Sequence, residues 1–328
     1  MDASTFDPAR QVTLQVNLSP GDVNYARLTV PALVRAHPRV AARLAVVDCC
    51  RAQRTRIFDP DRRLAEPGFS ERVAEIRRIA QEFEAQGLFD RVVYLVPGDP
   101  LLPALARKYV RPWMRETHDY AGCAFAGYWA GFELPATRFV AHFDADMMIH
   151  QAPGFDWVAE ALSHWAALPN VVGATPRISP PGFAARPEDD APSLREGRPK
   201  ERALGGWLND WFSTRCLLVD RERLAPHLPL VRGRLAWEYR LRRLIDRGYP
   251  PVPEGVLFRV LGPRGLRRLN LDSEQAWLQH PQTKPPEFVA LLPQILAAIA
   301  AGRVPPAQRG EPDVMLPEWR GFLSAKVP

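Results

Sequence analysis

The sequence has few cysteines, and their spacing excludes two classes of small domain. The 328 residues contain 4 cysteines, at Cys49, Cys50, Cys123 and Cys216. Their positions match neither the paired spacing of a structural zinc site nor the framework of a small disulfide-rich domain. We therefore expect reduced thiols, which are typical of a cytoplasmic protein.

Long apolar runs are also absent. No stretch approaches the about 18 apolar residues that a membrane-spanning helix needs, and residues 288–301, the best candidate, are typical of an amphipathic helix. No basic segment followed by an apolar one opens the chain, so we expect no signal peptide. The net charge of +6 and the pI of about 9.4 fit anionic substrates or peripheral contact with the inner face of a membrane.

The common nucleotide-binding motifs are missing too. The chain has neither G-x-G-x-x-G nor a G-K-[ST] loop, which argues against a standard dinucleotide or ATP site. No recognisable nucleic-acid-binding motif occurs, so we expect no nucleic-acid partner. We find no internal repeat.

The first half of the chain alternates between strand and helix patterns. Strands are expected at residues 12–18, 44–47, 91–96 and 138–143, and helices at residues 23–36, 69–86, 101–109 and 119–132. Short strands separated by helices predict an α/β fold with a mostly parallel central sheet flanked by helices.

The second half is less regular. The patterns predict helices at residues 156–167, 236–247 and 286–301, strands at 171–174, 256–261 and the end of 207–219, a long loop at 177–200, and a proline-rich tail after 301. A loop of that length is typical of a lid, a binding loop or a disordered segment.

Two aspartates follow a strand pattern that is a near-continuous apolar run. Residues 138–150 read RFVAHFDADMMIH, and a continuing strand would place Asp144 and Asp146 on the same side. Two neighbouring carboxylates repel each other, and a divalent cation is the simplest group to offset that repulsion. The alternative is an acidic turn, because aspartate is favoured in turns.

Two further aspartates stand in comparable positions. Asp48 ends the second expected strand, and Asp22 follows the first. Ligands of parallel α/β sheets bind outside the carboxyl ends of the strands, which favours a functional role for both residues. The alternative for each is a turn or capping residue.

In these residues the chain resembles the glycosyltransferases of the GT-A fold, in particular those of family 2. Asp144-Ala145-Asp146 is similar to their D-x-D motif, and it follows a small-residue segment at 122–131 and the apolar strand 139–143. Residues 237–241 and 247–249 resemble the later acidic and R…G-Y motifs. The resemblance covers residues 11–285.

The resemblance implies a Rossmann-like GT-A fold in three parts. Residues 1–150 would bind the nucleotide sugar, residues 151–285 would form the acceptor-binding and catalytic half, and residues 286–328 would add a helix and a tail.

The resemblance also implies a donor site. The residues implied to hold Mn²⁺ or Mg²⁺ are Asp144, Asp146 and His280, and those implied to bind the nucleotide sugar are Ser19, Asp22, Asp48 and Asp144. The alternative for His280 is an ordinary loop histidine.

On the acceptor side, the resemblance implies that Glu238 is the catalytic base, with Asp210 as a second candidate. Trp237-Glu238 replaces the usual Glu-Asp of the family. Trp207 and Trp211 would stack on a sugar face. The alternatives are a solvated acid at a helix start for Glu238 and core or rim aromatics for the tryptophans.

The leading hypothesis is therefore a metal-dependent, inverting glycosyltransferase of polysaccharide biosynthesis. It would move a sugar from a nucleotide-diphosphate donor to a hydroxyl of a glycan or lipid-linked acceptor. A sugar-phosphate nucleotidylyltransferase is one alternative, although residues 17–22 lack the glycine-rich, arginine-containing loop usual in that class. A non-catalytic glycan-binding domain of the same fold is another.

Overall fold

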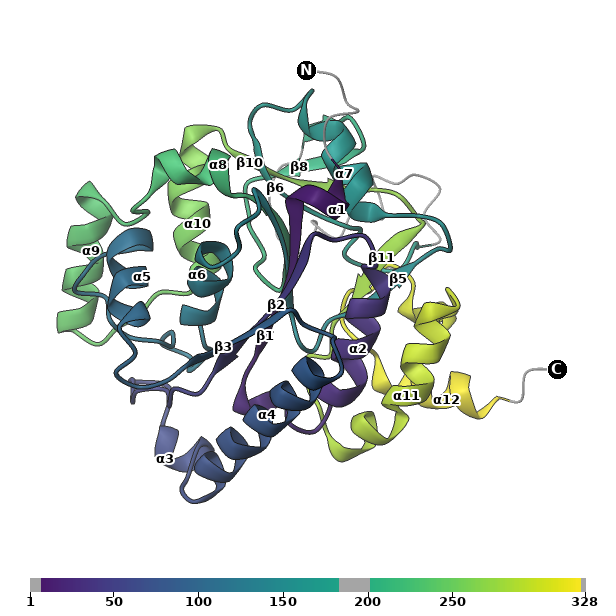
Figure 1. Cartoon of the computed structure of the whole chain (residues 1–328), viewed down its shortest axis with the longest axis horizontal. Helices are drawn as coiled ribbons and strands as arrows, with labels where there is room; N and C mark the ends of the chain where they lie inside the picture. The colour runs from purple at the N-terminus through teal and green to yellow at the C-terminus, as the bar shows by residue number, and fades with distance from the viewer. Residues whose placement is uncertain (1–6, 183–200, 326–328) are drawn as a thin grey trace.

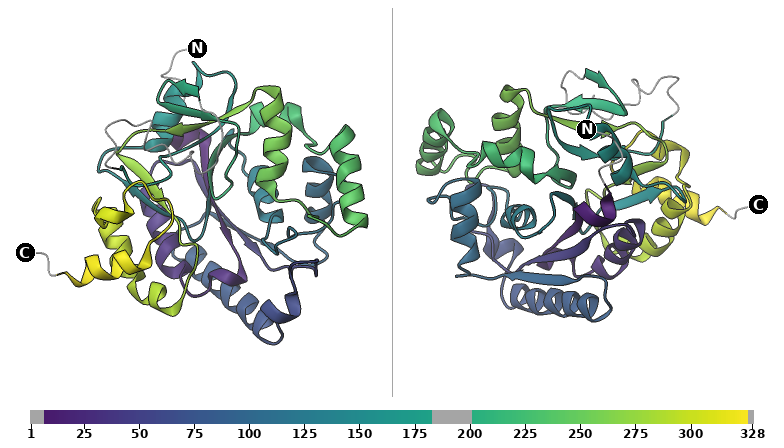
Figure 2. Two further views of the ribbon diagram at one scale, coloured as in Figure 1. Left: turned by 180° about the vertical axis from the view of Figure 1, so that it is seen from behind. Right: turned by 45° about the horizontal axis from the view of Figure 1, so that its top comes forward.

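The computed structural model describes residues 7–182 and 201–325. Their centre is a nine-stranded sheet in the order β3-β2-β1-β4-β9-β6-β10-β8-β7, with helices on both faces (Figures 1 and 2). The strands are β1 (Val12–Leu18), β2 (Ala42–Asp48), β3 (Arg91–Leu95), β4 (Phe139–Asp144), β6 (Val171–Thr175), β7 (Glu201–Ala203), β8 (Gly206–Asn209), β9 (Cys216–Asp220) and β10 (Arg267–Leu271). Strands from both expected halves thus share one sheet.

The sheet is mostly parallel, as the sequence predicts. Only β8 and β9 run against their neighbours, so the other seven strands point the same way. Strands β2 and β3 lie on one side of β1 and β4 lies on the other, so the chain order reverses between β1 and β4. Such a switch point opens a crevice at the carboxyl ends of the two strands. Asn17 and Asp144 are register partners there.

Apolar side chains from helices cover each face of the sheet. One face packs against α2 (Ala26–Ala36), α4 (Gly68–Ala85) and α7 (Trp157–Trp165). The other packs against α5 (Leu101–Tyr109), α6 (Ala126–Glu133), α8 (Arg221–Leu224), α9 (Gly233–Leu244) and α10 (Pro253–Leu261). The short helices are α1 (Pro8–Gln11), η2 (Pro20–Asp22), α3 (Pro60–Arg63), η4 (Ala225–His227), η5 (Gly262–Arg264) and η6 (Pro306–Gln308).

A second, two-stranded sheet brings the C-terminal region back to the turn at Ala145 and Asp146. Strand β5 (Met148–Gln151) pairs antiparallel with β11 (Ala276–Gln279). Helices α11 (Pro286–Ala300) and α12 (Leu316–Ser324) pack beside it around a third apolar cluster. Among the described residues, no helix combines the length and apolarity needed to cross a bilayer.

Helix α6 approaches β1 closely through two glycines. A Cβ on Gly131 would lie 2.3 Å from Gln15 Oε1, and one on Gly127 would lie 3.0 Å from Asn17 Oδ1. The glycines of this small-residue segment therefore let α6 pack closely on the sheet. It allows Gln15 and Asn17, both polar, to lie between sheet and helix.

Several expected elements differ from the structure. Residues 256–261 form part of α10 and not a strand, because a short apolar run fits a buried helix equally well. Residues 119–125 precede α6 as a loop, and the expected tail contains α12. Of the long loop expected at 177–200, residues 183–200 lie outside the described residues.

Candidate functional site

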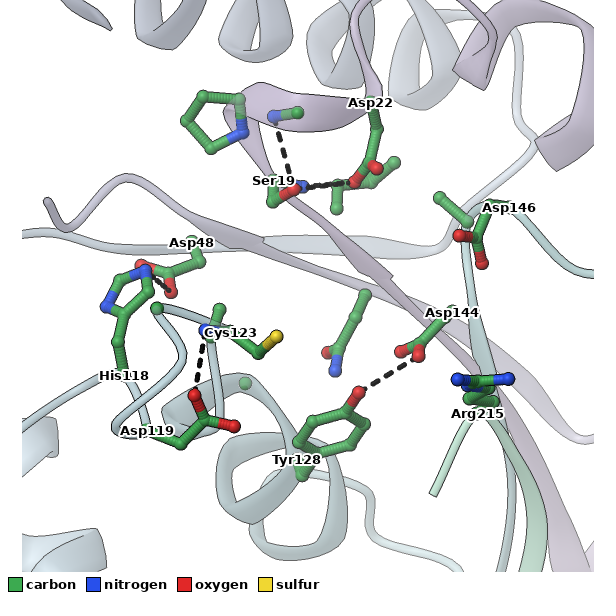
Figure 3. A pocket seen from close by; sticks show the side chains of 18 of the residues that line it. Ser19, Asp22, Asp48, His118, Asp119, Cys123, Tyr128, Asp144, Asp146 and Arg215 are labelled. Atoms are coloured by element: carbon green, nitrogen blue, oxygen red, sulfur yellow. Dashed lines mark hydrogen bonds and ion pairs between the residues drawn. The ribbon is translucent and has the colours of Figure 1, made fainter. Parts of the chain in front are cut away.

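A cavity of about 560 Å³ opens at the carboxyl ends of β1, β2 and β4. Its lining includes all six residues expected on the donor side, namely Ser19, Asp22, Asp48, Asp144, Asp146 and His280. In Figure 3, Ser19 and Asp22 lie on one side of the cavity, Asp144 and Tyr128 on another, and Asp48 and His118 at a third. Segments far apart in the sequence thus converge where the strand order reverses.

Asp144 is the last residue of β4 and is held by two neighbours. The Tyr128 hydroxyl donates to its Oδ2 at 2.9 Å. His142 Nε2 lies 3.3 Å from its Oδ1, and the other ring nitrogen of His142 is hydrogen-bonded to Gln15. Because alternate residues of a strand share a side, His142 and Asp144 point the same way. A buried polar chain therefore orients this carboxylate.

Asp146 lies in the turn after β4, so the strand does not continue through both aspartates. Its Oδ2 is 2.7 Å from Lys284 Nζ and 3.5 Å from His280 Nε2. Burial would raise the pKa of Asp146, but His280 and Lys284 outweigh burial and lower this pKa to about 2. Burial would also lower the pKa of His280, but Asp146 and Asp313 raise it. Asp146 is therefore a carboxylate paired with cations.

The remaining oxygen of Asp146, Oδ1, is buried and has no hydrogen-bond partner. A buried acceptor without a partner is costly unless a ligand or cation completes it. Within the described residues, no ready-made group of three or more ligating side chains occurs. Asp144, Asp146 and His280 nevertheless offer oxygen and nitrogen donors beside open space, and these fit a divalent cation that also takes ligands from a substrate.

Asp22 caps the short helix η2. Its Oδ2 accepts the Ser19 backbone N–H at 2.6 Å, and its Oδ1 accepts the Tyr25 hydroxyl. Burial raises the pKa of Asp22 to about 6, and the charge of Asp146 adds to the rise. The hydrogen bonds from Tyr25 and Ser19 act in the opposite direction and lower this pKa. Asp22 thus both lines the cavity and shapes the loop after β1, and its role in nucleotide-sugar binding stays a prediction.

Asp48 ends β2 and is 3% exposed. Its Oδ1 accepts the Cys50 backbone N–H at 2.8 Å, whereas its buried Oδ2 has no hydrogen-bond partner and lies 3.6 Å from His118 Nε2. Burial raises the pKa of Asp48 to about 7 and lowers that of His118 to about 4. This corner of the cavity therefore presents an acceptor that a ligand N–H or O–H can satisfy.

The cavity also contains functional candidates that the sequence did not indicate, among them Arg215, Glu254 and Lys284. Glu254 lies in the first turn of α10, where Thr214 Oγ1 donates to its Oε1 at 2.6 Å. Burial raises the pKa of Glu254, and the nearby Asp144 adds to the rise. The proline before Glu254 is a helix-start signal, but it points to no chemistry. Nothing around Arg215 or Lys284 forms a motif.

The acceptor-side residues expected from the sequence lie elsewhere. Glu238, on α9, forms ion pairs with Arg242 and Arg259, and Arg259 lowers its pKa. The ring centroid of Trp207 lies 5.1 Å from Cζ of Arg202, and the ring centroids of Trp211 and Phe258 lie 5.7 Å apart. The remaining candidate, Asp210, lies beside Gly262: a Cβ added to this glycine would lie 3.5 Å from the Cβ of Asp210. The described lining of the cavity includes none of these four expected residues, and their roles stay predictions.

No protein-family model and no curated protein matches the chain. Solved structures that resemble it include glucosyl-3-phosphoglycerate synthase from Mycobacterium tuberculosis in complex with Mn²⁺, UDP and glucosyl-3-phosphoglycerate, with 14% identity over 91% of this chain and 82% of that one and a TM-score of 0.38. S. aureus TarS 1-349 in complex with UDP matches with 11% identity over 90% and 68% of the two chains and a TM-score of 0.35. The galactosyltransferase LgtC in complex with donor and acceptor sugar analogs matches with 10% identity over 79% and 72% and a TM-score of 0.33. At these scores the likenesses carry no information on activity.

Proposed function

We propose that the protein is a metal-dependent glycosyltransferase of the GT-A type, which moves a sugar from a nucleotide-diphosphate donor to an acceptor hydroxyl. The observation that carries the proposal is the buried, unpartnered Oδ1 of Asp146 beside Asp144 and His280. These residues lie in a cavity of about 560 Å³ at the switch point of the sheet, where α/β folds bind ligands.

The donor site combines an acidic and a basic part. Asp48 offers its unpartnered oxygen to a hydroxyl or N–H of the nucleoside. Arg215 and Lys284 supply positive charge to the diphosphate, and both line the same cavity. Ser19 and Asp22 line the same cavity.

Asp144, Asp146 and His280 would hold Mn²⁺ or Mg²⁺. The metal would neutralise the diphosphate as it departs. Lys284 pairs with Asp146 Oδ2 and lines the same cavity, so its ammonium group would also be available to the diphosphate.

Glu254 is the best-placed general base. It lies in the cavity, and its raised pKa makes it a stronger proton acceptor than an ordinary carboxylate. Glu238 is a weaker candidate because two arginines already neutralise it and its pKa is lowered. In an inverting transfer, Glu254 would take the proton of the acceptor hydroxyl as the hydroxyl oxygen attacks the anomeric carbon.

The acceptor is a glycan or a lipid-linked saccharide in this proposal, with Trp207 and Trp211 as candidate sugar contacts. All four cysteines are free, which fits a reducing, cytoplasmic location. Peripheral contact with the inner face of a membrane is part of the same proposal.

Thermal unfolding with UDP, GDP, CMP and TDP, each with and without Mn²⁺, tests the donor site. A bound nucleotide stabilises the folded chain by about 2.7 kcal/mol at a hundred times its Kd. We expect one nucleotide to give a Mn²⁺-dependent shift that Asp146→Ala abolishes. The proposal fails if no nucleotide shifts the wild-type transition. Pyrophosphate release from a nucleoside triphosphate and a sugar phosphate would instead indicate a nucleotidylyltransferase.

A further inference from the structure

Exposed apolar side chains concentrate on one helix, α9. The large hydrophobic residues exposed in the described chain are Ile57, Leu204, Trp237, Leu241, Leu244, Ile245 and Met315. Four of these seven fall between residues 237 and 245, with exposed fractions of 71%, 58%, 84% and 55%. The spacing of Trp237, Leu241 and Leu244 places their side chains on one face of α9. The opposite face is anchored by Tyr239, which is 2% exposed.

The same segment is strongly basic. Residues 232–247 contain six arginines against Glu238 and Asp246, a net charge of +4 in a chain whose net charge is +6. Five of these arginines are exposed, at positions 232, 234, 240, 243 and 247. Glu238 is already neutralised by Arg242 and Arg259. Exposed apolar groups on α9 are therefore flanked by cations.

A second segment extends this surface beyond the end of α9. A hollow of about 400 Å³ is lined by Ile57 and Arg56 on one side and by Asp246 and Arg247 on the other. Ile57 is 64% exposed and Arg56 is exposed too. In Figures 1 and 2, α9 lies at the outer edge of the molecule, remote from α11 and α12. Apolar and basic side chains of two separate segments thus gather on one outer edge.

The chemistry of this face favours a lipid bilayer over a second copy of the chain. Two copies meeting through α9 would bring their arginines together, and like charges facing each other oppose association. An anionic bilayer offers phosphate groups to the arginines and an acyl boundary to the apolar residues. Tryptophan and leucine on one face with arginine at its sides is the pattern of helices that lie in the membrane interface.

We propose that α9 docks the protein on an anionic membrane surface. Trp237, Leu241, Leu244 and Ile245 enter the interface, and the flanking arginines contact lipid phosphates. Docking itself does not depend on the proposed transfer reaction. It bears on that reaction because Arg259 of α10 pairs with Glu238 of α9, and α10 also carries Glu254.

Vesicle flotation of the full chain tests the docking. Phosphatidylcholine vesicles with and without phosphatidylglycerol are compared at low and high salt. We expect binding only to the anionic vesicles, and weaker binding at high salt because salt screens the arginines. The double variant Leu241→Glu, Leu244→Glu should lower the affinity at least about tenfold. Arg234→Gln and Arg247→Gln should each lower it about fivefold.

Leu204→Glu is the matched control, because Leu204 is 57% exposed but lies between β7 and β8. It should bind vesicles like the wild type. The proposal is overturned if the wild type does not bind anionic vesicles at low salt, or if Leu204→Glu loses binding as strongly as the double variant. It is also overturned if the wild type is a dimer by size exclusion and the only effect of the double variant is to dissociate that dimer. Retention of the nucleotide-dependent thermal shift in the α9 variant shows that the cavity is intact, which separates failure of docking from failure of the proposed function.

Discussion

The ammonium group of Lys284 lies 2.7 Å from Asp146 Oδ2, on the carboxylate proposed to bind the metal. A cation and Lys284 therefore compete for Asp146. We expect Lys284→Met to raise the Mn²⁺ affinity of the nucleotide-free protein about tenfold, because the variant removes the competing charge. Titration calorimetry measures this. Weaker Mn²⁺ binding would mean that Lys284 orders the site and does not compete with the metal. Transfer activity should nevertheless fall, because the diphosphate loses a positive partner.

Asp146→Asn tests the metal site directly. The amide keeps the size of the side chain but loses the charge, so we expect transfer activity to fall at least about 100-fold and the Mn²⁺-dependent nucleotide shift to disappear. Asp90→Asn is the matched control, since Asp90 is an exposed aspartate just before β3, outside the described lining of this cavity. Equal activity in both variants would contradict the metal role of Asp146.

The catalytic base is tested by comparing two glutamates. Glu254→Gln should lower kcat by about 10²–10⁴-fold with little change in donor binding, because it removes the group that accepts the proton. Glu238→Gln should act mainly through α9, since Glu238 forms ion pairs with Arg242 and Arg259. Steady-state kinetics across pH distinguish the two glutamates. A larger loss of kcat in Glu238→Gln would return the role of base to Glu238.

Asp48 should make stability depend on pH. Its pKa is about 7 in the folded chain, against about 3.9 when unfolded. The stability associated with neutral Asp48 is fully present below about pH 4 and is lost as the pH rises through 7. Asp48→Asn removes this loss, so its free energy of unfolding relative to wild type should rise by about 2–4 kcal/mol between these pH values. Urea unfolding at both pH values measures the difference. A difference that does not change with pH would contradict the raised pKa.

Gly131→Ala tests the close approach of α6 to β1. The added Cβ would meet Gln15 Oε1 at 2.3 Å and displace the side chain that holds His142. We expect a loss of stability of about 1–3 kcal/mol together with lower activity, because His142 orients Asp144. Gly321→Ala, in α12 with no atom within 4 Å of the added Cβ, should be neutral or stabilising. Calorimetric melting of both variants is the measurement, and equal destabilisation of the two would contradict the steric explanation.

Most of the architecture, and six of the residues that line the cavity, could be predicted from the sequence. The strand and helix patterns of the first half predicted the parallel strands β1 to β4, since buried strands and amphipathic helices have distinct periodicities. Polar residues at strand ends were then expected to meet at one edge of the sheet. Asp48, Asp144 and Asp146 do meet there.

The remaining residues of the cavity lining could be identified only from the folded chain. Glu254, Arg215 and Lys284 stand in segments without a motif, and they reach the cavity because β9, α10 and the segment after β11 fold back beside the D-x-D turn. The apolar run at residues 256–261 predicts a strand, but these residues form part of α10. A short apolar run fits a buried strand and a buried helix equally well, so its sequence does not distinguish the two. Glu238 and Glu254 are both acidic residues on helices, and sequence could not separate them. Their different environments, two arginines for Glu238 and the cavity wall for Glu254, arise from contacts between distant segments.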